Sequence, residues 1–144
     1  MVKLTAEQMI QKDHVWLMKS PKYCLYSGIV MIGKTEVVDD VPTACTDGRN
    51  VKYGREFIEK LNERERRGVI LHENLHKAFR HLSMWKHLYK EWPVLANMAC
   101  DFVINLMIHD ADPRGGDVQL PAEGLLDEKY RGLDAGEVYR RLKK

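Results

Sequence analysis

Hydrophobic side chains in the middle of the chain recur at the spacing of an α-helix. At 100° per residue, one broad face between residues 69 and 82 collects apolar side chains: Leu71, Leu75, Ala78, Phe79 and Leu82. The opposite face collects polar side chains that we expect to face water: Arg67, Asn74, Lys77 and His81. Asn62 can cap this helix, and Glu65 can complete a capping box by reaching back to the Asn62 amide. The pattern therefore predicts a helix from about residue 62 to residue 82.

A second strong helix is predicted from Pro93 to about His109. Proline is accepted in the first turn of a helix. The residues that follow are apolar nearly all round, which is typical of a buried helix. Three polar residues interrupt this pattern at intervals of four and form one stripe along the helix: Asn97, Asp101 and Asn105.

The first twenty residues predict a packing helix. Thr5 and Gln8 fit a capping box that opens a helix running to about Met18. Ser20-Pro21 ends it, because the residue before a proline avoids the helical region.

The segments after this helix predict mainly strands. Residues 23–38 are rich in β-branched and aromatic side chains and predict one or two strands, broken near Gly28 or Gly33. Strands thus precede the 62–82 helix and helices follow it, which favours a single α+β domain spanning residues 1–144. The shorter predicted segments are a loop at 39–50 with a turn at Asp47-Gly48, a strand at 50–53, a helix at 55–61, a connector at 83–91, loops at 112–124, and a helix from Asp134 to about Leu142.

Composition narrows the functional classes. Charged residues make up 31% of the chain and the net charge is +2 with both signs interspersed, so we expect no nucleic-acid partner and no membrane surface as a partner. The N-terminus carries no signal-peptide pattern. The three cysteines are odd in number and form no C-x-x-C pair, which disfavours disulfides and favours the cytoplasm. Cys24 and Cys100 have apolar neighbours, and we expect both to be small core residues.

The helix predicted at residues 62–82 carries an H-E-x-x-H motif, His72-Glu73-Asn74-Leu75-His76. Residues four apart lie one above the other on one helix face, so both imidazoles can hold one ion. Zinc hydrolases use this arrangement with the glutamate as general base. The alternative is a pair of half-buried histidines without an ion, beside a solvated glutamate.

Asp101 is the strongest candidate for a third metal ligand. A carboxylate on a buried helix is costly unless it is paired or binds a metal. Asp101 follows His76 by 25 residues, which is enough for the helix at 93–109 to run antiparallel beside the helix at 62–82. Alternatively, Asp101 pairs with Arg80, Arg55 or a backbone amide and joins the helices.

The remaining histidines are weaker ligand candidates. In one continuous helix His81 points about 180° away from His72, so helix geometry excludes it. His109 lies about 12 Å beyond Asp101 along the helix axis, which favours a place outside the ligand set. His87, in the connector, stays open as a candidate.

Three stretches resemble a family of predicted metallopeptidases from bacteria and their phages. They are Thr43-Ala-Cys-Thr-Asp-Gly48, Gly68-Val-Ile-Leu-His-Glu-Asn-Leu-His-Lys-Ala-Phe-Arg-His81 and Asn97-Met-Ala-Cys-Asp-Phe-Val-Ile-Asn105, within a similarity that extends from about residue 25 to residue 142. Larger members join this domain to a von Willebrand factor A-like domain. None follows here, so we expect a stand-alone, minimal version. Residues 53–57 depart from the family, since many relatives carry an Asn-Pro pair there.

The resemblance implies a zincin-like, gluzincin-type site with one zinc ion. His72, His76 and Asp101 would be the ligands and Glu73 the catalytic residue. The small N-terminal sheet would pack on a helical core formed by the motif helix and the antiparallel ligand-bearing helix.

These inferences predict a zinc-dependent peptidase acting on a peptide or protein substrate. Glu73 would take a proton from the attacking water and deliver it to the leaving amine. Asn97 and Asn105 would orient Asp101 or a histidine, and the strand at 27–38 would offer its edge to the substrate. Candidates for the oxyanion partner are His109, Tyr53 and Tyr130. The alternative function is a catalytically idle zinc-binding module that acts through a protein partner.

Overall fold

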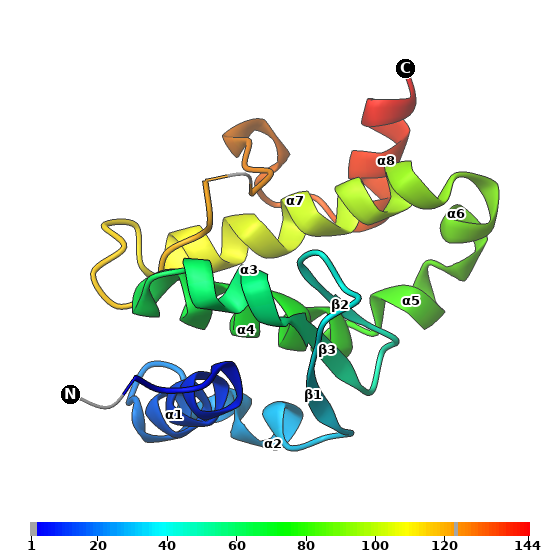
Figure 1. Ribbon diagram of the computed structural model, residues 1–144. Helices are drawn as coiled ribbons and strands as arrows, with labels where there is room; N and C mark the ends of the chain where they lie inside the picture. The colour runs from blue at the N-terminus through cyan, green and yellow to red at the C-terminus, as the bar shows by residue number, and fades with distance from the viewer. Residues whose placement is uncertain (1–2, 123) are drawn as a thin grey trace.

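Helix α4 (Glu63–Ala78) runs through the middle of the molecule and carries the H-E-x-x-H motif (Figure 1). The computed structural model describes residues 3–122 and 124–144. Helix α1 (Ala6–Lys19) packs against one side of α4, and the long helix α7 (Pro93–Ala111) packs against another side. The chain runs in opposite directions along α4 and α7, so the predicted antiparallel pair of helices is confirmed (Figure 1).

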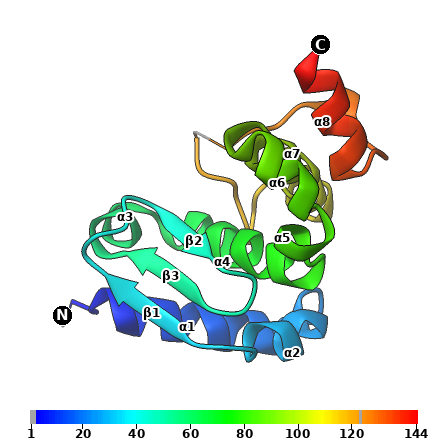
Figure 2. The same cartoon turned by 90° about the vertical axis from the view of Figure 1, so that its right-hand side faces the viewer.

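A three-stranded sheet covers a further side of α4 (Figure 2). Its strands are β1 (Thr35–Val38), β2 (Ala44–Thr46) and β3 (Val51–Gly54), in the order β1-β3-β2. Strand β1 pairs parallel to β3, and β2 pairs antiparallel to β3. Strand β2 is therefore an edge strand, and it contacts α4. Short helix α3 (Arg55–Lys60) follows β3 and leads into α4. The predicted α+β class is confirmed.

Helix α6 (Lys86–Glu91), the 3₁₀ turn η2 (Glu128–Tyr130) and helix α8 (Ala135–Lys143) pack around α7 and form a second hydrophobic cluster with it. Short helix α5 (His81–Met84) lies between α4 and α6 and contacts both. Among the described residues, only α7 is long and apolar enough to cross a membrane by length and composition. Half of that stretch is buried inside the protein, as in the core helix of a folded domain. Its exposed positions include Val94 and Met107, so it is less completely buried than predicted.

The capping residues found in the sequence open the helices that they predict. The Thr5 hydroxyl accepts from the Gln8 amide and the Asn62 side chain accepts from the Glu65 amide, each within a complete capping box. The Asp134 carboxylate accepts from the Glu137 amide at the start of α8. These caps satisfy backbone N–H groups that have no partner within the helix.

The prediction of strands throughout residues 23–38 is wrong for most of that segment. A 3₁₀ turn η1 (Cys24–Tyr26) and helix α2 (Ser27–Val30) precede β1, and only the last four residues form a strand. Helices and not strands cover this part of the chain: η1 packs on α1, and α2 packs on α1 and α4, whereas Leu25 is 88% exposed. Strand preference depends on such neighbours. Cys24 is likewise exposed and is not a core residue, whereas Cys100 is buried as predicted.

The loop predicted at 39–50 contains strand β2, which the sequence analysis missed. The turn at Asp47-Gly48 is present: the Asp47 carboxylate accepts from the amides of Arg49 and Asn50. Strand β2 is only three residues long and shows no alternation of hydrophobic side chains, so pairing with β3 alone defines it.

The end and the polar face of the motif helix differ from the prediction. Helix α4 ends at Ala78, because Arg80 adopts a left-handed conformation with φ of 54° and starts α5 in a new direction. Ala78 and Phe79 are therefore exposed instead of packing on the core. The four residues expected to face water are all buried: Arg67, Asn74, Lys77 and His81. The first three lie on α4, which is covered on several sides, and His81 lies on α5.

Candidate metal centre

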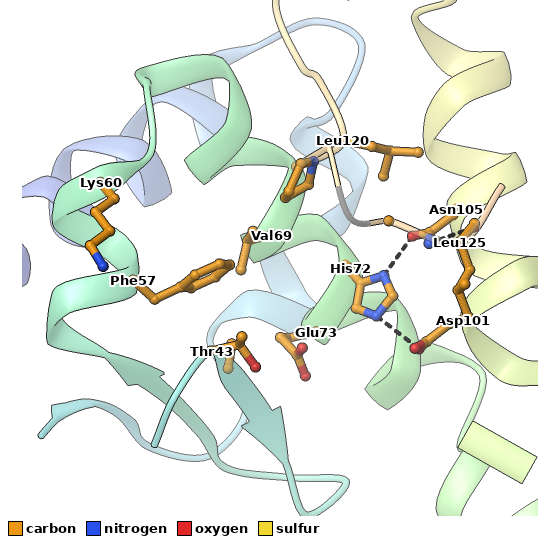
Figure 3. A pocket seen from close by; sticks show the side chains of 14 residues that line it. Thr43, Phe57, Lys60, Val69, His72, Glu73, Asp101, Asn105, Leu120 and Leu125 are labelled. Carbon is orange, nitrogen blue, oxygen red and sulfur yellow. Dashed lines mark hydrogen bonds and ion pairs between the residues drawn. The ribbon is translucent and has the colours of Figure 1, made fainter. Parts of the chain in front are cut away.

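Helices α4 and α7 bring the three predicted metal ligands into one group (Figure 3). The Asp101 Oδ1 atom lies 3.0 Å from His72 Nε2 and 3.0 Å from His76 Nε2. The two Nε2 atoms lie 3.1 Å apart. One turn of α4 separates the histidines, and the antiparallel α7 places Asp101 opposite both rings. Neither Arg80 nor Arg55 pairs with Asp101 in the described part of the chain, and Arg55 instead contacts Glu7 and Asp39.

Asn105 fixes which nitrogen of His72 faces Asp101. The Asn105 Nδ2 group donates to the Leu125 carbonyl at 2.8 Å, which orients the amide. Its Oδ1 atom lies 2.8 Å from His72 Nδ1 and accepts that proton. In a neutral imidazole the other nitrogen then carries a lone pair. In the neutral ring the His72 Nε2 lone pair therefore points at the Asp101 carboxylate, so that either a second proton on His72 or a bound cation has to lie between these two acceptors.

This convergence of acceptors fits a cation. A zinc ion bound at about 2.0–2.1 Å in tetrahedral geometry holds its ligand atoms roughly 3.3 Å apart. The three contacts within the group are 3.0, 3.0 and 3.1 Å, so a small opening of the triangle would accept such an ion. Two imidazole nitrogens and one carboxylate oxygen are ligands that zinc prefers.

The charges in the group are strongly coupled. Burial would raise the pKa of Asp101, but hydrogen bonds from His72 and His76 outweigh it and hold that pKa at about 2. Burial also disfavours the charged form of His72, yet the contact with Asp101 outweighs it and raises the pKa of His72. Asp101 is thus ionised at neutral pH and supplies negative charge to the site.

His81 is not one of the three grouped residues, but it lies next to His76, whereas in one continuous helix it would point about 180° away from His72. The left-handed turn at Arg80 brings the ring back, so that His81 Nδ1 lies 3.1 Å from His76 Nδ1. Burial, together with the charge of His76, lowers the pKa of His81 to about 4, so this ring is neutral near pH 7. A neutral His81 can accept the proton of His76 Nδ1 and leave His76 Nε2 free to bind an ion.

The two asparagines of the polar stripe are not equivalent. Asn105 is buried and contacts both His72 and Leu125. Asn97 is exposed, and its single contact with the site is a donation from Nδ2 to Asp101 Oδ2 at 3.4 Å. Only Asn105 is tightly built into the site.

The other residues named as candidates lie away from the ligand group. His87 is exposed on α6, and His109 lines a separate cavity at the end of α7. Tyr130 packs on Phe102 in the second hydrophobic cluster. Tyr53 is fully buried and lines neither of the cavities that reach the ligands.

Glu73 lies beside the three ligands and lines the cavities that reach them (Figure 3). It is 7% exposed. Burial raises the pKa of Glu73, and the charges of His72 and His76 partly offset this effect. The carboxylate can therefore reach a molecule bound next to the ligands while it is otherwise shielded from bulk water.

Two cavities meet at the ligand group. The larger has a volume of about 490 Å³ and the smaller about 270 Å³. Both are lined by His72, Glu73 and Asp101, and by Thr43 and Ala44 at the start of β2. Tyr89 of α6 lines the smaller cavity and was missed by the sequence analysis, since no local pattern connects this tyrosine to a motif on α4.

Fold and site together define a class: a small α+β domain in which a helical His-Glu-x-x-His segment and a carboxylate from an antiparallel helix form a candidate metal centre. Residues 24–144 match the protein-family model described as "Putative metallopeptidase domain". The match covers most of the sequence, and the chain belongs to this metallopeptidase family. Comparison with the curated proteins gives no significant match, and neither does comparison with the solved structures.

Proposed function

We propose that the protein is a zinc-dependent peptidase in which His72, His76 and Asp101 hold one zinc ion and Glu73 is the general base. Membership of the family supports metal-dependent peptidase activity. The observation that carries the zinc site is the contact of Asp101 Oδ1 with both Nε2 atoms, with Asn105 directing a lone pair of His72 toward the same point.

A zinc ion held by this group would supply a Lewis acid that polarises a peptide carbonyl and lowers the pKa of a water molecule. Glu73 takes the proton from the attacking water and gives it to the leaving amine as the peptide bond breaks. Asn105 and His81 keep the protons of His72 and His76 on their Nδ1 atoms. Asp101 would supply the negative charge of the ligand set.

Strand β2 is the edge on which we place the substrate, in place of the strand predicted at 27–38. Strand β1, the part of that segment that forms a strand, lies at the opposite edge of the sheet. The Thr43 carbonyl accepts from the Gly54 amide, and the Asp47 amide donates to the Asn50 carbonyl. The backbone N–H and C=O groups of the odd-numbered residues in this segment therefore point toward β3. The N–H and C=O groups of Ala44 therefore point outward. Ala44 lines both cavities, where an extended peptide could pair with it.

Tyr89 is the group that we assign to the developing oxyanion, in place of His109, Tyr53 and Tyr130. It lines the smaller cavity together with Asn97 and Asp101. Burial raises the pKa of Tyr89, so its hydroxyl stays protonated and can donate a hydrogen bond.

Replacement of Glu73 by glutamine tests the proposal. The zinc-loaded wild type should hydrolyse unfolded protein substrates. The Glu73→Gln variant should bind zinc with near-unit stoichiometry, measured by elemental analysis, and lose at least about 100-fold in kcat, as expected for loss of a general base. Unchanged activity of this variant would eliminate the mechanism. A wild type that binds zinc but hydrolyses nothing would identify an idle zinc-binding module instead.

A further inference from the structure

The two cavities beside the ligand group differ in chemistry. The larger is walled by apolar side chains, among them Pro121 and four that Figure 3 labels: Phe57, Val69, Leu120 and Leu125. Lys60 stands at its far end, away from Asp101 (Figure 3). The smaller cavity is lined beyond the shared residues mainly by polar side chains: Cys45, Thr46, Tyr89 and Asn97. A molecule bound across His72, His76 and Asp101 therefore meets an apolar chamber on one side and a small polar chamber on the other.

The apolar wall is held in place by contacts to α4 and α7. Gly68 has no side chain, and a Cβ atom at this position would lie 2.2 Å from the Gln119 carbonyl, so only glycine lets the 119–120 segment approach α4. The Gln119 amide donates to the Arg64 carbonyl, and the Leu125 carbonyl accepts from Asn105. The chamber is thus a pre-formed part of the fold. Its volume of about 490 Å³ falls within the range of about 300–1,000 Å³ usual for ligand pockets.

The direction of β2 determines which of the two cavities receives the part of a paired peptide that follows the scissile bond. The strand begins near the larger cavity, which Thr43 and Ala44 line, and continues to Cys45 and Thr46, which line only the smaller one. Antiparallel pairing is slightly more stable per residue than parallel pairing. A peptide added antiparallel to β2 would run from the smaller cavity to the larger one. Its residue after the scissile bond would then enter the apolar chamber.

We propose that the substrate is an extended peptide with a large apolar residue, such as leucine or phenylalanine, directly after the scissile bond, and that the apolar chamber selects this residue. This inference rests on the proposed peptidase function. A charged side chain next to the scissile bond would be desolvated there against Val69, Leu120 and Leu125, because Lys60 stands at the far end of the chamber, away from Asp101. Such desolvation is costly. Pockets that differ by a few apolar contacts discriminate roughly 10- to 200-fold.

Peptides that differ at one position test the inference in the wild-type protein. The zinc-loaded protein is incubated with blocked peptides of the form acetyl-Gly-Ala-Ala-X-Ala-Ala-Gly-amide, in which X is leucine, phenylalanine, aspartate or lysine. Mass spectrometry identifies the cleaved bond. Cleavage should occur before X, and kcat/KM should be at least about tenfold higher for leucine and phenylalanine than for aspartate.

A pair of neighbouring substitutions tests the role of the chamber. Leu125→Lys places a cation in the wall and should shift the preference toward aspartate by at least about tenfold relative to leucine. Leu126→Lys is the matched control: Leu126 is on the same segment and is 40% exposed, but it does not line the larger cavity. This control should keep the wild-type preference. Each preference is the ratio of kcat/KM for two peptides measured with one protein. A loss of folded enzyme lowers both values equally and leaves this ratio unchanged.

The outcomes separate this inference from the function on which it rests. Equal rates for the four peptides, cleavage after X, or the same shift in both lysine variants would overturn the inference and leave the peptidase function standing. No cleavage of any of these peptides, nor of unfolded proteins, would overturn the peptidase function and the inference with it.

Discussion

The buried asparagine of α7 offers the sharpest test of the metal centre. Asn105→Ala removes two hydrogen bonds of 2.8 Å, one from His72 Nδ1 and one to the Leu125 carbonyl. The His72 ring then loses the acceptor that keeps its proton on Nδ1. Loss of such a supporting contact typically lowers metal affinity 10- to 100-fold, which corresponds to about 1.4–2.8 kcal/mol of binding free energy. The protein without metal should also be destabilised, because a buried group left without a partner costs about 1–3 kcal/mol.

Asn97→Ala is the matched control for this prediction. The side chain lies on the same helix and its amide also contacts the ligand group, but it is exposed and the contact is 3.4 Å long. Substitutions at exposed positions usually change free energies by about 0.5 kcal/mol or less. The zinc affinity of the Asn97 variant should therefore stay within about threefold of wild type.

Competition with a coloured zinc chelator measures both affinities, and urea unfolding in the absence of zinc measures stability. Asn105→Asp separates the two contributions, since a carboxylate still accepts from His72 but faces the Leu125 carbonyl without a donor. This variant should keep more of the zinc affinity than Asn105→Ala while it loses stability. Equal losses of zinc affinity for Asn97→Ala and Asn105→Ala would refute the assignment of the His72 tautomer.

Two further predictions concern histidines outside the H-E-x-x-H motif. His81→Phe keeps the ring that stacks on Phe79 but removes the acceptor of His76 Nδ1, so zinc affinity should fall about tenfold or more; an affinity equal to that of a His87→Phe control would contradict this. His14 is half-buried, and its burial together with the charge of Lys77 lowers its pKa to about 4. The pKa of His14 is lower in the folded protein than in the unfolded chain, so the neutral ring favours the folded state. This contribution to the free energy of unfolding is present above about pH 6.5 and is lost as the pH falls toward 4. Urea unfolding should show that the wild type loses about 2 kcal/mol more than His14→Gln between pH 7 and pH 5; parallel profiles would count against the shifted pKa.

The sequence alone determines those parts of the fold that are encoded by neighbouring residues. The capping boxes at Thr5 and Asn62 depend on side chains three residues apart, and the spacing of His72 and His76 places both on one helix face. The stripe of Asn97, Asp101 and Asn105 likewise follows from the helical repeat. These signals predict the two helices of the candidate centre, and the cost of burying a carboxylate singles out Asp101.

Only the tertiary structure decides which faces are covered and what the ends of the helices contact. Helix α4 is enclosed by α1, α7 and β2, so Lys77 and Asn74 are buried although their positions in the helical pattern suggest a solvent face. His81 reaches His76 because the chain turns at Arg80, a single backbone conformation that continuous helical geometry does not anticipate. Strand β2 is defined by its pairing with β3, and residues 24–30 are helical where they pack on the helices α1 and α4. Local sequence fixes the helical period and its caps, whereas burial and strand pairing depend on partners that are distant in sequence.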